Sequence, residues 1–331
     1  PPRSTPLYSS AASDVYKRQN DKKIFHPKGV DFYNIQNKKI CDLDLTQFNT
    51  DQSKYTTLQR STLIEFLKDD IYTQHLRFGK KIKEVSELKG KVLIKFEDNT
   101  NDLVDIVVGA DGIFSNTRSF FEKKKNEPKF KKAVALRIIL KTKSELNVDE
   151  EKISLMMGKN CHIVIYPVNQ NKELNLVCII RDKKYDPDNI KTLVNKVVTQ
   201  NSNLEKVFEG DLKSWPLYFT PKILPSTNNK VFYIGDAFNG FLPTLAQGAG
   251  QSIESAHELF NLIKDDKAEI QNTYFKERLR RAKIVKRRSN INFFAFHFSS
   301  SIMQIIRNIF MKFLIKRKSF VNSYLGAVYK N

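Results

Sequence analysis

The sequence predicts an α/β protein with α+β elements, organised as two interleaved domains followed by C-terminal helices. Three observations predict this class. Two apolar segments, 104–108 and 231–234, each lead into a loop that contains Gly and Asp. An amphipathic helix pattern follows the second of them, and strand-like segments separated by polar linkers lie between residues 133 and 182. An α/β layer therefore occurs twice along the chain, with a mostly antiparallel sheet inserted between its two parts.

The first native elements are expected after residue 19. Residues 1–19 are rich in Ser, Pro and Ala, unlike the Lys-, Asn- and Ile-rich remainder, and we interpret them as a non-native leader. Alternation of apolar and polar residues predicts a hairpin over 29–45 that turns at Gln36-Asn37. Helical spacing predicts a helix over 57–71, with Ser61 as its cap.

The remaining elements follow from the same patterns. We expect a second hairpin at 80–85 and 91–98, which leads into a buried strand at 104–108, and antiparallel strands at 133–140, 161–168 and 174–182. A buried strand within 228–237 precedes a helix over 250–263. The apolar face of this helix is expected to comprise Ile253, Ala256, Leu259, Phe260 and Ile263. Helices are expected from Gln271 onward.

Composition excludes several classes of protein. The net charge is +20, but the basic residues are mostly scattered Lys without interleaved aromatic residues, so we expect no nucleic-acid partner. The three cysteines, Cys41, Cys161 and Cys178, are far apart, which argues against a disulfide framework or a metal site and favours a reducing cytoplasm. No apolar run reaches the length of about 18 to 20 residues that spans a membrane.

The segment Val104–Arg118 joins an apolar strand to a loop that carries Asp111 and Gly112. In sheets buried on both faces, ligands bind beyond the carboxyl ends of the strands, where Asp111 would lie. Gly112 lets the backbone turn sharply, and Arg118 could bind a phosphate or carboxylate through two hydrogen bonds. The same residues also fit an ordinary turn followed by a surface arginine at a helix start, and this segment alone leaves both interpretations open.

The segment Val231–Ile263 has a similar arrangement. Its strand ends in Gly235-Asp236, a loop with Pro243 follows, and Gly248-Ala249-Gly250 opens the helix. The carboxylate of Asp236 is suited to accept hydrogen bonds from sugar or ribityl hydroxyls. Free N–H groups and the positive end of the helix dipole favour an electron-rich or anionic ligand group. The ordered set of motifs therefore indicates a ligand site.

These motifs resemble those of the FAD-dependent aromatic-ring monooxygenases, a family that contains salicylate, para-hydroxybenzoate and ubiquinone-pathway hydroxylases. GADGIFSNTR is similar to its DG motif, and GDAFNGFLPTLAQGAGQSIESA is similar to its GD motif. LQRSTLIEFL is similar to the segment whose arginine, here Arg60, reaches the flavin nucleotide. HIVIYPVNQNKELNLVCII resembles the sheet that walls the substrate pocket in the salicylate hydroxylase branch. The resemblance extends from about Gly29 to the C-terminal helices.

The resemblance implies a flavoprotein monooxygenase that hydroxylates a small aromatic compound with NAD(P)H and O2, through a flavin C4a-hydroperoxide. Because the flavin carries this chemistry, no catalytic side chain is assigned. Asp236 would contact the ribityl chain and pyrophosphate, Asp111 would serve both FAD and NAD(P)H, and Arg118 would hold the DG motif in place. The implied cofactor-binding residues are Arg60, Asp111, Gly112, Arg118, Gly235, Asp236, Pro243, Gly248, Ala249 and Gly250.

The chain departs from the family pattern at two places. It has no GxGxxG, which normally holds the ADP half of FAD, so we expect an N-terminally truncated FAD-binding Rossmann-like domain. We assign residues 20–118 and 230–270 to that domain, 119–229 to an antiparallel-sheet substrate domain, and 271–331 to C-terminal helices. The second departure is Phe238-Asn239-Gly240-Phe241, where the family often has Ala-His-Pro-Met, which implies a differently shaped pocket.

Three residues are candidates for contact with substrate. Tyr166 could stack on an aromatic ring, although core packing explains it equally well. Arg137, the lone charge in AVALRIIL, could pair with an anionic substrate or face outward. Phe241 lies beside the altered GD motif. For His162, His257 and His297, packing or surface positions are favoured over catalysis.

The C-terminal segment leaves open whether the protein contacts a membrane. Its aromatic and aliphatic residues at helical spacing, flanked by Lys and Arg, suit either a helix packed on the main body or peripheral contact with the inner face of the membrane. Membrane contact would fit a ubiquinone-pathway hydroxylase that acts on a polyprenyl phenol. Two further alternatives are a FAD-binding oxidoreductase that does not insert oxygen and an inactive fragment.

Overall fold

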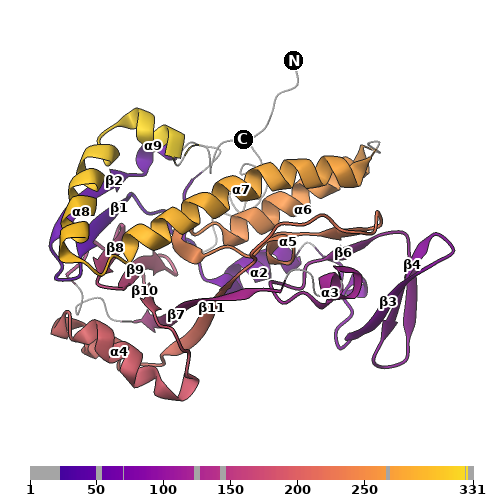
Figure 1. Cartoon of the computed structure of the whole chain (residues 1–331), viewed down its shortest axis with the longest axis horizontal. Coiled ribbons are helices and arrows are strands. Elements are labelled where there is room, and N and C mark those ends of the chain that lie inside the picture. Colours follow the sequence, from indigo (N-terminus) through magenta and orange to yellow (C-terminus); the bar gives the residue numbers. More distant parts are fainter. Residues whose placement is uncertain are drawn as a thin grey trace. The chain divides into compact units, whose positions relative to one another are not determined.

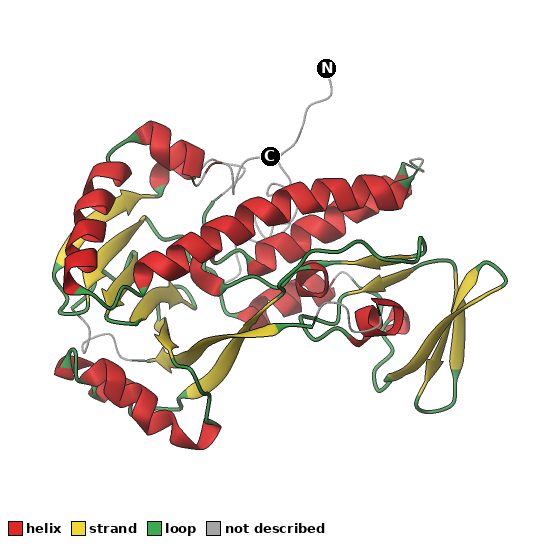
Figure 2. Ribbon diagram, viewed as in Figure 1, coloured by secondary structure: helices red, strands yellow, loops and turns green. Residues whose placement is uncertain are grey.

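The computed structural model describes residues 23–49, 54–69, 71–122, 127–141, 147–265, 269–324 and 326. The predicted leader, 1–19, lies outside these residues. The chain divides into two compact units (Figures 1 and 2). The first unit comprises residues 1–70, 132–217 and 291–331, and the second comprises residues 71–131 and 218–290. These boundaries differ from those of the predicted segments, because residues 29–44 fold with residues 133–181. The functional assignment of those segments stays a prediction.

The first unit is built on a seven-stranded sheet with the order β11-β7-β10-β9-β8-β1-β2. Neighbours β7 to β10, β10 to β9, β9 to β8 and β1 to β2 are antiparallel, whereas β1 and β8 are parallel. The predicted strands and the first hairpin are confirmed, and Asn37 turns that hairpin with a φ of 61°. The strand bounds are β1 Gly29–Asn34, β2 Lys39–Asp44, β7 Lys129–Leu140, β8 Ile153–Gly158, β9 Cys161–Val168, β10 Glu173–Arg181 and β11 Lys213–Phe219.

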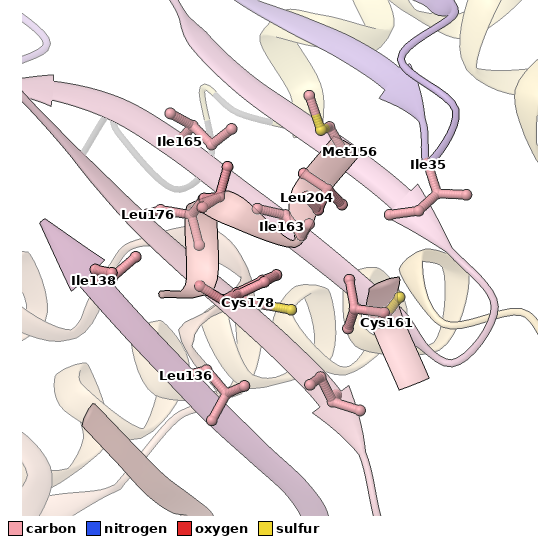
Figure 3. Close-up of a cluster of buried hydrophobic side chains, with 14 of the residues drawn as sticks. Ile35, Leu136, Ile138, Met156, Cys161, Ile163, Ile165, Leu176, Cys178 and Leu204 are labelled. Carbon is pink, nitrogen blue, oxygen red and sulfur yellow. The ribbon is translucent and has the colours of Figure 1, made fainter. Parts of the chain in front are cut away.

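Both faces of this sheet are covered. On one face, alternate residues of β7, β9 and β10 form a cluster that includes Leu136, Ile163 and Leu176, each fully buried (Figure 3). Helix α4, Ile190–Val198, adds Leu193 and Val197 to this cluster. On the other face, the C-terminal helices α8, Ser301–Ile315, and α9, Lys318–Tyr324, contribute to the packing of β1, β2 and β8. Because strand side chains alternate between faces, residues such as Val164 and Tyr166 belong to this second face.

The second unit contains two small sheets. Strands β3 Ile82–Leu88, β4 Lys91–Phe96 and β5 Asn101–Val104 are antiparallel, which confirms the second hairpin. Strands β6 Val107–Gly109 and β12 Val231–Tyr233 are parallel. The expectation of one buried strand over 104–108 is wrong, because Val104 ends β5 and Val108 is 41% exposed. The chain passes from one sheet to the other at Asp105-Ile106, so the residues of this apolar run belong to two different sheets.

The predicted helices are confirmed as α2 Arg60–Asp69, α6 Gly248–Lys264 and α7 Ile270–Phe296, whose ends lie close to the expected positions. Helices α3 Asn116–Glu122 and α5 Gly235–Phe238, like α4, were not predicted. Ser61 lies inside α2, so its assignment as a cap is wrong. Short 3-10 helices span Thr46–Phe48, Thr73–His75, Pro187–Asn189, Ser202–Leu204, Lys206–Phe208 and Pro243–Leu245.

Helix α6 buries only part of the face that was expected. Leu259 is buried, but Phe260 is 60% exposed and Ile263 is 37% exposed, whereas the polar side chains of Gln251 and Glu254 are buried. Apolar spacing did not predict these buried polar positions because they are paired with arginines of α7.

Two buried histidines join the end of α7 to the sheet in the first unit. His162 Nδ1 on β9 lies 3.1 Å from His297 Nε2. His297 Nδ1 lies 2.6 Å from the carbonyl oxygen of Phe293, one turn earlier. Burial lowers the pKa of His297 to about 4, the cations of Arg181 and Arg307 add to the lowering, and hydrogen bonds to main-chain carbonyls oppose it. Burial and the neighbouring His297 also hold the pKa of His162 well below its usual value. Both rings are therefore neutral at pH 7.

We expect the free energy of unfolding to fall as the pH drops from about 6.5 to about 4. Unfolded histidine binds a proton below its pKa of 6.5, whereas folded His297 binds one only near pH 4, so acid favours the unfolded state. This difference corresponds to about 3 kcal/mol. Urea unfolding across this range should show a weaker pH dependence for His297→Phe than for the parent. Substitution of the exposed His75 by Phe should leave it unchanged, and equal slopes in all three proteins would contradict the assignment.

Candidate functional site

The parallel pair β6 and β12 brings the DG and GD motifs to the same edge of their sheet. Gly109 pairs with Tyr233, and the amide of Ile234 donates to the carbonyl oxygen of Gly109 at 3.0 Å. The Asp111-Gly112 and Gly235-Asp236 segments therefore follow the carboxyl ends of two neighbouring strands. This is the edge at which ligands bind in open α/β sheets.

The DG loop has a turn that requires glycine. Gly112 has a φ of +81°, which side-chain-bearing residues rarely adopt. The exposed carboxylate of Asp111 accepts hydrogen bonds from Ser115 Oγ at 2.5 Å and from the amide of Thr117 at 2.9 Å. Asp111 thus fixes the start of α3.

Arg118 connects the two motifs. Its Nη1 donates to the carbonyl oxygen of Ala237 at 2.9 Å, and its Nη2 donates to that of Ile113 at 3.2 Å. The side chain is 8% exposed, so the alternative of a surface arginine is wrong. A charged donor shared between two loops holds them at a fixed separation.

The GD motif lies where β12 ends and α5 begins. Gly235 has a φ of +56°, and a Cβ at this position would lie 2.5 Å from Ser252 Oγ, so the close approach of α5 and α6 requires glycine. The amide of Gly235 donates to Ser255 Oγ at 3.0 Å. Asp236 follows on α5 and is exposed.

Helix α6 begins at Gly248, two residues before the start of the helix expected over 250–263. Gly248 and Ala249 are exposed, Gly250 is half-buried, and the exposed Pro243 precedes them in a 3-10 turn. The free N–H groups of the first turn and the helix dipole favour a negatively polarised ligand group here. The predicted Gly-Ala-Gly segment is therefore the first turn of the helix itself.

A buried ion network, which sequence reasoning missed, holds α6 against α7. Glu254 accepts from Arg278 Nη1 at 2.8 Å and from Arg281 Nε at 2.8 Å, while Arg278 Nη2 donates to Gln251 Oε1 at 2.9 Å. Although burial opposes ionisation, the two arginines hold the pKa of Glu254 below its usual value. The sequence feature that could have predicted this network is the spacing of three residues between Gln251 and Glu254 and between Arg278 and Arg281.

Asn239, in the departure after the GD motif, has an unusual environment. Its side chain is fully buried, and neither Oδ1 nor Nδ2 has a hydrogen-bond partner among the described residues. The adjacent amide of Gly240 donates to Thr220 Oγ1 at 2.9 Å, which holds the backbone of this loop. Phe241 is half-buried and packs against the apolar cluster around β6 and β12.

The first unit brings two predicted substrate residues together. Arg137 Nε donates to Asn175 Oδ1 at 2.6 Å, and Asn175 is opposite Tyr166 in the register of β9 and β10. Burial raises the pKa of Tyr166, whereas the nearby Arg137 cation and the Asn175 side chain act in the opposite direction. Sequence reasoning missed Asn175, a lone amide within an apolar strand.

Arg60 is exposed and is the first residue of α2, in the first unit, while the DG and GD motifs lie in the second.

Over the described ranges, no group of three or more His, Cys, Asp and Glu residues is arranged to hold a metal. None of the helices in the part of the chain that is described has the length and apolar character needed to cross a bilayer.

Comparison with protein families gives a match to the squalene epoxidase model over residues 104–327. Salicylate hydroxylase from Pseudomonas putida is 24% identical over 244 residues, which cover 66% of this chain and 56% of that protein. The 3-amino-4-hydroxybenzoate 2-monooxygenase PtmB3 of Streptomyces platensis is 24% identical over 271 residues, which cover 77% of this chain and 67% of that protein. The chain therefore spans about half to two thirds of the length of these relatives.

Comparison with solved structures confirms the predicted fold class. Klebsiella pneumoniae HpxO, in complex with FAD and uric acid, has a TM-score of 0.82 at 13% identity, with 98% of this chain and 86% of that chain covered. A salicylate hydroxylase substrate complex has a TM-score of 0.74 at 15% identity, with 99% and 90% covered.

We expect Arg118→Ala to lower the free energy of unfolding by about 2 to 4 kcal/mol, because the carbonyl groups of the buried Ala237 and the half-buried Ile113 lose a charged donor. Urea unfolding measures the change. Arg280→Ala, at an exposed position on α7, is the matched control and should change stability by less than about 0.5 kcal/mol. Similar effects of the two substitutions would show that the Arg118 contacts contribute little.

We expect Asn239→Leu to raise the free energy of unfolding by about 1 kcal/mol, because it replaces an unpaired buried amide with an apolar group of similar size. Asn175→Leu is the control: the equally buried Asn175 also has an unpartnered Nδ2, but its Oδ1 accepts a hydrogen bond from Arg137, and loss of that bond should destabilise. Thermal unfolding of both variants distinguishes the two environments. If Asn239→Leu destabilises the protein as much as Asn175→Leu does, the amide of Asn239 has a hydrogen-bond partner.

Proposed function

Because the chain belongs to the squalene epoxidase family, and because its curated relatives include aromatic-ring hydroxylases, we propose that it is a flavoprotein monooxygenase. The reaction we propose is hydroxylation of a small aromatic compound with NAD(P)H and O2. The observation that carries the proposal is the placement of both Gly-Asp segments at neighbouring ends of β6 and β12, with the buried Arg118 between them.

The residues of the second unit fit part of an FAD molecule. The exposed carboxylate of Asp236 can accept hydrogen bonds from ribityl hydroxyls, and Asp111 supplies a second carboxylate at the same sheet edge. The open first turn of α6 is suited to the electron-rich pyrimidine edge of the flavin, and Pro243 would lie against its ring. When bound, FAD supplies hydride acceptance from NAD(P)H and activation of O2.

The side chains of this chain would then position the cofactor. Arg118 fixes the separation of the DG and GD loops, and the ion network around Glu254 fixes the start of α6. Stabilisation of the negative charge that a reduced flavin carries depends on that placement, because the dipole effect falls off within the first helical turn. Arg60 would contact the nucleotide, as the family resemblance implies.

For the substrate, we propose a small aromatic compound that carries a negative charge. Support comes from the half-buried Arg137 and from Tyr166, which share one face of the sheet with the buried Asn175. Arginine can bind a carboxylate through two hydrogen bonds, and a tyrosine ring can stack on an aromatic ring. Phe241, through its position beside the GD motif, remains a third candidate.

We also propose that the protein acts in the cytoplasm, with peripheral contact at the inner face of the membrane through its C-terminal basic helices. Its three cysteines are free, as expected in a reducing compartment.

The experiment that tests the activity is titration of the chain with FAD, followed by oxidation of NADH or NADPH with aromatic carboxylates in the presence of isotope-labelled O2. Label in the organic product establishes hydroxylation. Peroxide formation without labelled product would instead establish an oxidoreductase that does not insert oxygen. Absence of FAD binding would establish that this chain is inactive by itself.

We expect Asp236→Ala to weaken FAD binding by at least about tenfold, because a charged hydrogen-bond acceptor to the ribityl chain is lost. Quenching of flavin fluorescence measures the affinity. Asp105→Ala removes another exposed aspartate of the same unit, between β5 and β6, and should leave FAD affinity unchanged. Equal affinity of the Asp236 variant and the parent would count against the proposed role.

A further inference from the structure

Helix α8 packs with a mixed polar and apolar side toward the protein. Arg307, in the middle of the helix, is only 5% exposed, and its Nη1 donates to the carbonyl oxygen of Ala295 at 3.2 Å. Its Nε and Nη2 donate to Asn308 Oδ1 at 3.1 and 2.9 Å. Met311 and Ile315 provide apolar contacts between α8 and the rest of the first unit. A surface helix normally turns its apolar stripe inward, whereas α8 places a buried arginine at the middle of its inward side.

The opposite side of α8 is a continuous apolar stripe. Ile302, Ile306, Ile309 and Phe313 follow one another at intervals of four, three and four residues, which places them on one line along the helix. Their exposed fractions are 69%, 40%, 62% and 53%. Ile305 and Phe310, at 59% and 60%, widen the stripe. Monomeric proteins seldom expose an apolar surface of this length unless it binds something.

The charge around the stripe indicates the chemistry of its partner. The sequence contains no Asp or Glu from Arg278 to Asn331. Lys312, Lys316, Arg317 and Lys318 are exposed at the end of α8. The guanidinium of Arg317 lies 4.0 Å from the ring centroid of Phe313, so a cation adjoins the apolar stripe directly. The partner must accept aliphatic side chains along one line and supply negative charge beside them.

A membrane that contains anionic lipid meets both requirements. Acyl chains accept apolar side chains without a complementary pocket, while lysine and arginine reach back to the head groups. With 15 residues, α8 is about 22 Å long, shorter than the hydrocarbon core of about 30 Å, so it would lie along the surface.

We propose that α8 binds the interface of an anionic bilayer, with the stripe Ile302, Ile306, Ile309 and Phe313 among the acyl chains and Lys312, Lys316, Arg317 and Lys318 at the head groups. This inference deepens the peripheral membrane contact proposed above and assigns it to one face of one helix. It does not require FAD or turnover. Failure of the hydroxylase proposal would therefore leave it standing, and its own failure would leave the hydroxylase proposal standing.

The test is co-sedimentation of the whole chain with vesicles of phosphatidylcholine alone and of phosphatidylcholine mixed with phosphatidylglycerol. We expect at least about tenfold stronger binding to the mixed vesicles, because each basic residue near the surface adds to the attraction. Ile309→Glu should weaken that binding at least about tenfold, since an acyl-facing isoleucine becomes an anion. Lys316→Gln combined with Lys318→Gln should reduce the difference between the two kinds of vesicle.

Leu103→Glu is the matched control, because Leu103 is a comparably exposed apolar residue, 50% accessible, on β5 of the second unit. It should bind vesicles as the parent does. No binding to anionic vesicles, or equal binding by the Ile309 variant and the parent, would overturn the proposal. Light scattering that shows a dimer of the parent and a monomer of the Ile309 variant, without vesicle binding, would assign the stripe to a second copy of the chain and would also overturn it.

Discussion

The parallel pairing of β6 with β12 is the constraint on which the candidate cofactor site depends. These strands have only three residues each, yet they align two Gly-Asp segments that are more than a hundred residues apart in sequence. A ladder of three residue pairs fixes the register of the two strands but not the conformation of the loops that follow them. Arg118 supplies the missing restraint because one guanidinium serves carbonyl groups from both loops. The site is thus specified by backbone pairing and one buried cation.

Local patterns predicted most of the strands and helices. The first hairpin, the strands β7, β9 and β10 and the DG and GD segments all depend on neighbours in sequence, such as a turn residue at Asn37 or an apolar run before Gly235. Strands β8 and β11 of the large sheet were not predicted. The same patterns failed where partners are distant. Burial of Glu254 depends on two arginines in another helix, and apolar periodicity contains no information about them.

The candidate substrate-contact residues show, in a sheet, the same limit of prediction from local sequence patterns. Considered alone, Tyr166 had an equally good explanation as a packed core residue and Arg137 as an outward-facing residue, and their shared face becomes evident only from the register of three strands. Asn175 lies between them in that register and was not distinguishable from any other polar residue in a strand. Strand register, unlike strand location, depends on nonlocal pairing, so it could not be read from the separate segments.

The Glu254 network has a consequence for how sequences of this kind can change. Loss of the glutamate alone would remove a carboxylate that two buried cations share and leave Arg278 paired with Glu258, and loss of either arginine would weaken the pairing of a buried anion. A single replacement that removes the charge at any one of these three positions upsets the charge balance of the network. We therefore expect replacements that change charge to occur together at these positions. A correlated triplet across α6 and α7 would be the evolutionary trace of a helix whose first turn must not move.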